Sequence, residues 1–233
     1  MTTTIEYPFI LVNLKTYEES LGPKAVALAS IAREISQETG VCIAVAPQTV
    51  DLSPVIKAVK IPVFAQHIDP VGYGRFTGHV LPEAIADAGC VGTLINHSER
   101  RLPLETIEAT VNRAKEAGLF QVVCVDSVEA GRSVAPFSPD VIAIEPPELI
   151  GSGIPVSKAR PEVVSGSVEE CRKVNPDVNV LCGAGITSGE DVAAALRLGS
   201  AGVLVASGVV KAADPRAKLL DLAEAMRELD PPT

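Results

Sequence analysis

Residues 141–153 read VIAIEPPELIGSG, and the fold can be worked out from this stretch. Its first four residues are the β-branched and small apolar types found in strands that are buried on both faces. The run ends in a carboxylate, Glu145, which is followed by two prolines and a loop closing on Gly151-Ser152-Gly153. Burying an acid beside an apolar strand is costly without a partner or a role. The stretch therefore predicts a parallel strand with a functional group at its carboxyl end.

Seven similar apolar runs occur elsewhere in the chain, and a helical pattern follows each run. Strands that alternate with helices indicate right-handed βαβ units and a parallel sheet. Eight such units in 233 residues predict a compact, closed (β/α)8 barrel of the α/β class that forms a single domain over residues 1–233. The eight predicted strands are Phe9–Asn13, Val41–Pro47, Pro62–His67, Val91–His97, Gln121–Asp126, Val141–Glu145, Asn179–Gly183 and Ala201–Ser207.

An open doubly wound sheet is the structural alternative to the barrel. Such a sheet usually has a glycine-rich dinucleotide-binding turn after its first strand. The corresponding segment here, VNLKTYEESLG (residues 12–22), has no such turn. The barrel is therefore the favoured architecture.

Composition argues against several classes of partner. The chain has 20 Lys+Arg against 29 Asp+Glu, a formal net charge of −9, which disfavours nucleic acid and anionic membrane surfaces. A small anionic substrate remains compatible, since a local site can be positive inside an acidic protein. The five cysteines lack metal-ligand spacing, so we expect no metal and free thiols in a reducing cytoplasm. The amino-terminal segment has no basic leader, and its apolar run of six residues is too short to span a membrane.

Polar residues at the carboxyl ends of the predicted strands are the candidates for chemistry, because barrels of this kind carry their sites there. Three of them, Lys15, His97 and Glu145, supply a cation, an imidazole and a carboxylate. They suit a substrate with a carbonyl and an acidic C–H: Glu145 as base, His97 as hydrogen-bond partner of the oxygen, and Lys15 as a fixed positive charge.

Small-residue turns end the seventh and eighth runs, where such barrels often bind phosphate. These turns are Gly183-Ala184-Gly185 and Ala206-Ser207-Gly208. They let backbone N–H groups approach phosphate oxygens closely, and a following helix adds its dipole. With Gly151-Ser152-Gly153 they form three sides of one predicted anion site.

Each of these features also has an ordinary structural explanation. Lys15 can be a surface lysine, His97 a satisfied core histidine, Glu145 the partner of an arginine, and the glycines simple turn residues. We interpret His67, Asp126 and the cysteines in this structural way. The functional interpretation is favoured for the others because all of them fall on one predicted rim.

Five motifs resemble the triosephosphate isomerase family, in order and approximate spacing, over nearly the whole chain. NHSERR together with the Glu-Pro…Ile-Gly-x-Gly segment is a highly specific pair. The compact length, and a Gly-Ala-Gly turn where most members have Gly-Gly-Ser, resemble the archaeal branch. The motifs are Asn13–Lys15 (NLK), Ile95–Arg101 (INHSERR), Ala143–Gly153 (AIEPPELIGSG), Cys182–Ile186 (CGAGI) and Val205–Gly208 (VASG).

The resemblance implies a TIM barrel that interconverts dihydroxyacetone phosphate and D-glyceraldehyde 3-phosphate through an enediolate, without cofactor or metal. Glu145 would be the general base, His97 the neutral electrophile and Lys15 the balancing charge, the arrangement known for this family. Glu99 would hold Lys15 in place, and Ser98 would steady the base before the loop closes. Substrate contacts are implied for Asn13, Leu14, Lys15, Ile150, Gly151, Gly153, Gly183, Ala184, Gly185, Ala206 and Ser207.

The resemblance also explains the prolines after Glu145. Pro146 and Pro147 restrict the backbone, so residues 148–153 would swing as one piece over bound phosphate and exclude water. The sequence departs from the family at two positions that would latch this lid: the chain has no Trp for the hinge, and the turn after the seventh strand lacks the family's usual Tyr and Ser.

A further segment, Tyr73–Gly78, resembles the loop that family members insert into a neighbouring subunit, with Thr77 near its tip. The resemblance therefore implies a homo-oligomer, with a tetramer expected ahead of a dimer.

Two other functions remain as alternatives. One is another phosphate-binding barrel enzyme, such as a sugar-phosphate epimerase or an aldolase; an aldolase needs a Schiff-base lysine inside the barrel, and the eight runs contain no lysine. The other is a non-catalytic barrel that binds phosphometabolites, which would be marked by loss of the base or the electrophile.

Overall fold

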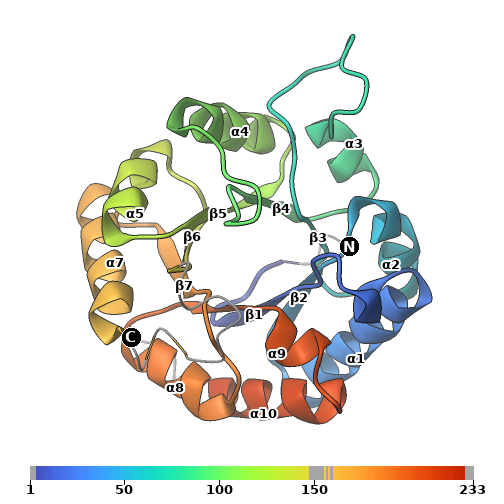
Figure 1. Cartoon of the computed structure of the whole chain (residues 1–233), viewed down its shortest axis with the longest axis vertical. Coiled ribbons are helices and arrows are strands. Elements are labelled where there is room, and N and C mark those ends of the chain that lie inside the picture. The colour runs from blue at the N-terminus through green and yellow to red at the C-terminus, as the bar shows by residue number, and fades with distance from the viewer. Residues whose placement is uncertain (1–3, 147–154, 156, 158–159, 229–233) are drawn as a thin grey trace.

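Eight parallel strands form the centre of the protein, and helices surround them (Figure 1). The computed structural model describes residues 4–146, 155, 157 and 160–228. Neighbouring strands follow the order β2-β1-β8-β7-β6-β5-β4-β3. The strands are β1 (Phe9–Asn13), β2 (Cys42–Ala46), β3 (Phe64–Ala65), β4 (Gly92–Ile95), β5 (Phe120–Val125), β6 (Val141–Ile144), β7 (Asn179–Cys182) and β8 (Gly202–Val205).

The ring closes between β2 and β3. A single parallel bridge pairs Val45 with Val63, and the Val45 N–H donates to the Pro62 carbonyl at 3.1 Å. This contact turns an eight-stranded sheet into a nearly closed barrel, which confirms the predicted fold over the open alternative.

The helices fall between the strands, as the sequence predicts. Among the described residues, four α-helices begin with a proline, which is favoured at the first helical position because its missing N–H is not needed there. The connection after β5 is a seven-residue helix followed by a short 3-10 turn. The α-helices are α1 (Pro23–Thr39), α2 (Leu52–Ala58), α3 (Pro82–Asp87), α4 (Leu104–Glu116), α5 (Val128–Val134), α7 (Pro161–Val174), α8 (Gly189–Arg197), α9 (Ser207–Val210) and α10 (Pro215–Arg227), and the 3-10 helices are η1 (Glu18–Ser20), η2 (Thr49–Asp51) and η3 (Ala135–Phe137).

Six strands, β2, β3, β4, β6, β7 and β8, are shorter than predicted, and for two of them the local reason is clear. β3 has two residues instead of the run Pro62–His67, because it meets β2 only through the bridge at Val63 and Pro62 has no N–H to donate. β4 ends at Ile95 because Asn96 has a positive φ of 60° and turns the chain out of the sheet.

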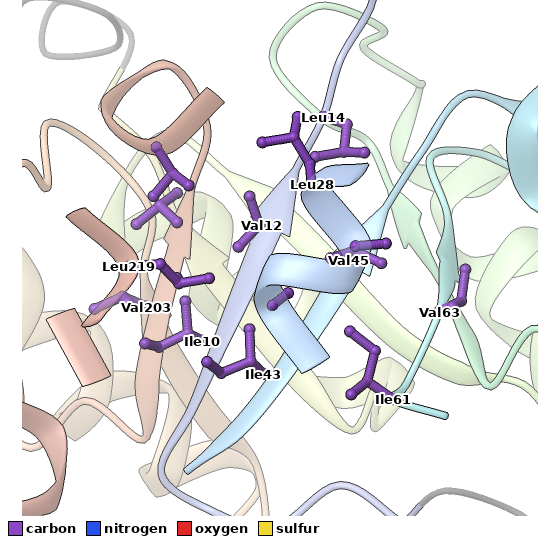
Figure 2. Packing of buried hydrophobic residues seen from close by; sticks show 14 of the residues in the cluster. Ile10, Val12, Leu14, Leu28, Ile43, Val45, Ile61, Val63, Val203 and Leu219 are labelled. Carbon is purple, nitrogen blue, oxygen red and sulfur yellow. The ribbon is translucent and has the colours of Figure 1, made fainter. Parts of the chain in front are cut away.

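Side chains alternate between the barrel interior and the layer under the helices, as the two-residue period of a strand requires. In β6, Val141 and Ala143 point inward, whereas Ile142 and Ile144 point toward the helices. Around β1, β2 and β8, that outer layer is packed by leucines of α1 and α10 (Figure 2). The inward alternation continues to Glu145, so the strand itself aims this carboxylate into the mouth of the barrel.

The floor of the barrel is aromatic. Phe9, Phe64 and Phe120 begin β1, β3 and β5, and their rings meet edge to face, with centroids 6.4 Å apart for Phe9 and Phe120 and 5.8 Å apart for Phe64 and Phe120. This floor closes the amino-terminal end, so the carboxyl ends of the strands are the open face. No helix within the described residues is long and apolar enough to cross a membrane.

Candidate active site

A cavity of about 370 Å³ opens at the carboxyl ends of the strands. It brings together residues from five strand ends, β1, β4, β6, β7 and β8, which lie far apart in the sequence. Gly208, from the predicted turn after β8, also lines it, together with Tyr17, Ile186 and Thr187, which were not predicted. The predicted residues in its wall are Asn13, Lys15, His97, Glu99, Glu145, Gly183, Gly185, Ala206 and Ser207.

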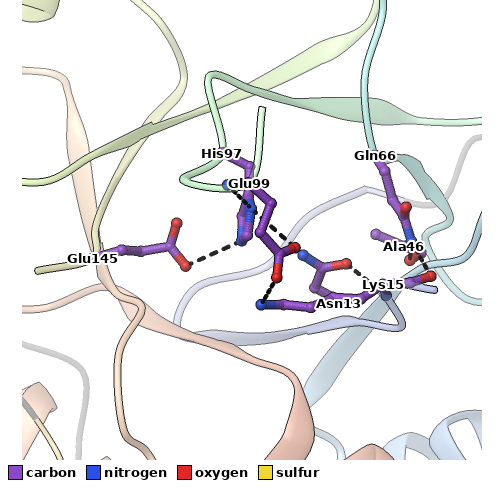
Figure 3. Close-up of polar contacts among 7 residues, drawn as sticks. All are labelled: Asn13, Lys15, Ala46, Gln66, His97, Glu99 and Glu145. Carbon is purple, nitrogen blue, oxygen red and sulfur yellow. Dashed lines mark hydrogen bonds and ion pairs between the residues drawn. The ribbon is translucent and has the colours of Figure 1, made fainter. Parts of the chain in front are cut away.

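Glu145 and His97 face each other across this cavity (Figure 3). Glu145 Oε1 lies 3.6 Å from His97 Nε2, and both side chains are buried. The separation is too long for a direct hydrogen bond. The second carboxylate oxygen of Glu145 is buried without a hydrogen-bond partner among the described residues. The carboxylate is therefore free to accept a proton from a ligand.

A backbone hydrogen bond determines which ring nitrogen of His97 is the acceptor. The Glu99 N–H donates to His97 Nδ1 at 3.2 Å, so Nδ1 acts as the acceptor. A neutral imidazole then has its proton on Nε2, the nitrogen that faces the cavity and Glu145. In this state His97 donates a hydrogen bond to an oxygen bound between the two side chains.

The residue before His97 sets the direction of its side chain. Asn96 is in the left-handed conformation, which Asn tolerates better than most residues. Its amide donates to the Cys124 carbonyl at 2.8 Å and accepts the Leu102 N–H at 2.8 Å. Sequence reasoning placed Asn96 at the strand end but gave it no role; the Asn after an apolar run was the available signal.

Lys15 is held at three points (Figure 3). Its φ of 48° is unusual for a non-glycine residue and needs support from its surroundings. The Lys15 N–H donates to Asn13 Oδ1 at 3.0 Å, and the Lys15 carbonyl accepts from Gln66 Nε2 at 3.0 Å. The ammonium donates to Glu99 Oε1 at 2.9 Å. Gln66, which also donates to the Ala46 carbonyl at 2.9 Å, is a support whose role the sequence did not reveal.

The wall opposite His97 consists of backbone turns. Gly183 and Gly185 follow β7, and α9 begins at Ser207 directly after β8. The first N–H groups of a helix have no acceptor within the helix. The turn after β7 is fixed from behind, since Asp191 Oδ2 accepts the Thr187 N–H at 3.0 Å. The Gly183 N–H donates to the Ile144 carbonyl at 3.0 Å, so the N–H groups suited to an anion are those of Gly185 and of the start of α9.

Comparison with known proteins agrees with this geometry. A family model described as triosephosphate isomerase matches residues 8–226.

The chain belongs to the triosephosphate isomerase family.

Three proteins named triosephosphate isomerase illustrate the similarity. The one from Methanosarcina acetivorans is 60% identical over 215 residues, which cover 92% of this chain and 97% of that protein. The one from Methanocaldococcus jannaschii is 56% identical over 220 residues, 94% of this chain and 97% of that protein. The one from Methanothermobacter thermautotrophicus is 55% identical over 215 residues, 92% of this chain and 94% of that protein. The resemblance read from the motifs is confirmed, and with it the expected enzyme class, an isomerase.

Some residues that the triosephosphate isomerase resemblance implied are not in the cavity wall. Leu14 packs its side chain in the layer between β1 and the helices (Figure 2), and Ala184 is buried behind the turn. Ser98 is half-buried, and no hydrogen bond joins it to Glu145 in the described part of the chain. Ile150, Gly151, Gly153 and Pro147 lie outside the described residues.

The residues assigned a structural role are consistent with that role. His67 Nε2 lies 3.0 Å from Asp69 Oδ1, and Arg101 pairs with Asp126 at 3.0 Å. All five cysteines are free. Burial, reinforced by the nearby Glu145 carboxylate, raises the pKa of the Cys124 thiol well above its usual value. Within the described residues, no group of three His, Cys, Asp or Glu side chains could hold a metal.

Proposed function

We propose that this cavity interconverts dihydroxyacetone phosphate and D-glyceraldehyde 3-phosphate through an enediolate. Glu145 moves the proton between the two carbons, and neutral His97 donates Nε2–H to the oxygens that exchange roles. Lys15 balances the negative charge that develops. The observation that carries the proposal is the 3.6 Å gap between Glu145 Oε1 and His97 Nε2, beside the clamped Lys15.

Phosphate is bound in this proposal by backbone amides of the turns after β7 and β8. Gly185, Ala206 and Ser207 line the cavity, which supports this assignment. Gly183 lines it too, but its N–H donates to the Ile144 carbonyl. Contact from residues 150–153 stays a prediction from the sequence. No step of the reaction needs a cofactor or a metal, because the proton transfer and the charge balance use side chains alone.

A coupled isomerisation assay tests the roles directly. Glu145→Gln and His97→Gln are each expected to lower kcat by about 10²-fold or more, since a positioned acid or base contributes roughly 10²–10⁴-fold. Glu129→Gln, an exposed position on α5, is the matched control for loss of a carboxylate. A Glu145→Gln enzyme whose rate stays within a few-fold of wild type would show that Glu145 is not the base.

We also propose a homo-oligomer, with a tetramer favoured over a dimer. The segment between β3 and α3 extends away from the barrel (Figure 1), and Tyr73 on it is 80% exposed. A hollow of about 410 Å³ on the other side of Lys15, lined by Thr49 and Gln66, is a suitable receptor for Thr77 of a second copy. Light scattering measures the mass; a single monomeric species at dilute concentration would contradict the proposal.

The setting of the protein is proposed on two further grounds. Five free thiols are typical of a reducing cytoplasm, which we propose as its location. The organisms of the relatives support an archaeal source.

We propose that residues 1–233 form a single domain, since the eight strands share one ring.

A further inference from the structure

A second hollow adjoins the substrate cavity on the side of the phosphate turns. It measures about 510 Å³ and shares Ser207 and Gly208 with the cavity. Two lysines, Lys211 and Lys218, lie in its wall. Two carboxylates, Asp214 and Asp221, lie in the same wall, so the charge that each lysine offers to a ligand depends on its own contacts.

The two lysines differ in what their ammonium groups contact. Lys218 Nζ donates to the Thr187 carbonyl at 2.8 Å and lies 4.0 Å from an Asp221 carboxylate oxygen, so it serves the turn after β7. Lys211 is exposed, and its Nζ lies 4.3 Å from the centroid of the Tyr17 ring. No carboxylate of the described chain lies within ion-pair distance of Lys211. Its charge is therefore available to an incoming anion.

Tyr17 places this charge at the edge of the cavity. The Tyr17 ring comes from the loop after β1 and lines the cavity, and a cation over an aromatic face is attracted by the ring quadrupole. The contact joins the β1 side of the mouth to the α9 side, where Ser207 begins the helix. Lys211 is thus fixed next to the phosphate turns without touching the position of the reacting carbons.

The surrounding charges make this position important. The chain has a formal net charge of −9, and Glu145 adds a negative charge inside the cavity. Among the described residues that line the cavity, Lys15 is the one lysine, and its ammonium is already paired with Glu99. A doubly charged substrate therefore approaches an acidic protein whose inner cation is partly neutralised. Two more lysines, Lys211 and Lys218, lie next to the phosphate turns, and Lys218 is already held by the Thr187 carbonyl and Asp221.

We propose that Lys211 is a substrate-capturing residue that attracts the phosphate dianion at the outer edge of the cavity and so favours phosphorylated over neutral trioses. This inference rests on the proposed function. A charge near the mouth of a site raises the local concentration and association rate of an opposite charge, and salt screens the effect. Because Lys211 increases the rate at which the charged substrate associates, its loss should lower kcat/KM for that substrate.

The test compares kcat/KM for D-glyceraldehyde 3-phosphate with that for D-glyceraldehyde, the same triose without phosphate. Lys211→Gln is expected to lower the ratio of kcat/KM for the phosphorylated triose to kcat/KM for the neutral triose by about threefold to tenfold at low salt. This is the effect expected when one positive charge that attracts a dianion is removed. In 0.5 M NaCl the difference from wild type should shrink to about twofold or less. Lys211→Arg, which keeps the charge, should restore at least half of the loss.

Lys60→Gln is the matched control, because Lys60 is exposed between α2 and β3 at the opposite end of the barrel and its loss changes the net charge equally. The control should keep the wild-type ratio. The proposal is overturned if Lys211→Gln keeps the wild-type ratio, or if Lys211→Gln lowers the ratio equally at low and high salt. It is also overturned if Lys60→Gln lowers the ratio as much as Lys211→Gln does.

Binding of inorganic phosphate, followed by calorimetry, separates this inference from the proposed function. If wild type shows no isomerase activity, the proposed function fails, yet Lys211→Gln should still weaken phosphate binding about threefold or more while Lys60→Gln does not. Equal phosphate affinity in wild type and Lys211→Gln, or a wild type that binds no phosphate, overturns the role of Lys211.

Discussion

Gly183 and Glu145 are packed so closely that a Cβ atom on Gly183 would lie 2.5 Å from Glu145 Cγ. Real Cβ atoms do not approach another carbon this closely, so the absence of a side chain at Gly183 creates the space in which the carboxylate lies. The two residues end neighbouring strands, β7 and β6. The turn after β7 therefore positions the proposed base as well as lining the anion site.

Gly183→Ala should displace the Glu145 side chain. We expect kcat to fall by about 10²-fold, because a shift of about 1 Å in a reacting group can cost this much, and the free energy of unfolding to fall by about 1–3 kcal/mol from overpacking. The coupled assay and denaturant unfolding measure the two effects. Gly166→Ala is the control: its Cβ would meet Val128 Cγ2 at an ordinary 3.6 Å. Activity of Gly183→Ala within threefold of wild type would contradict this reading.

Gln66→Met tests the support of Lys15. Methionine has a similar length but cannot donate to the Lys15 and Ala46 carbonyls, so Lys15 should lose the support for its left-handed backbone. We expect kcat/KM to fall about tenfold and the free energy of unfolding by about 1–3 kcal/mol. Gln37→Met, at an exposed position of α1, should change neither quantity. A loss of stability with full activity would show that Gln66 supports the fold and not the site.

The buried histidine next to Asp69 should make stability depend on pH. Burial lowers the pKa of His67 below its usual 6.5, and this outweighs the opposing hydrogen bond to Asp69. The unfolded chain therefore binds this proton more readily, so the contribution to stability is complete above pH 6.5 and is lost as the pH falls below it. Desolvation raises the pKa of Asp69, but hydrogen bonds from the Val80 N–H and His67 outweigh it, so that the pKa lies below its usual 3.8. The contribution of Asp69 to stability is therefore lost only as the pH falls below 3.8.

Denaturant unfolding at pH 7.5 and pH 5 measures this effect. His67→Asn should reduce the difference in unfolding free energy between the two pH values. His79→Asn removes an exposed histidine and should keep the wild-type difference. The same difference in wild type and His67→Asn would mean that other groups account for it.

The cysteines should differ in their reaction with iodoacetamide. Burial raises the pKa of Cys90 and of Cys182 to about 12, that of Cys171 to about 11, and that of Cys124 well above its usual value. Only the thiolate reacts, so these four should stay unlabelled in the native protein at pH 8. Cys42, which is partly exposed, should be labelled first, and all five after unfolding. Mass spectrometry counts the labels; early labelling of Cys124 would show that the barrel interior opens.

The sequence alone determined the barrel and the strand ends that face its mouth. Eight apolar runs alternating with helical patterns require parallel strands, and the two-residue period of a strand fixes that Glu145 continues the inward row of Val141 and Ala143. These are local properties, because they depend only on residues that are close together in the sequence. The specificity of the motifs also led from sequence to the family.

Tertiary structure decided how the site is held. Gln66 reaches the carbonyl of Lys15 across 51 positions, and Glu99 reaches its ammonium across 84. Gly183 leaves space for the Glu145 side chain, which follows the neighbouring strand, and the Lys211 ammonium lies over the Tyr17 ring. Periodicity tells which way a side chain points but not which distant group it meets. Those contacts exist only once the ring of strands has closed and brought the ends of the chain's separate units together.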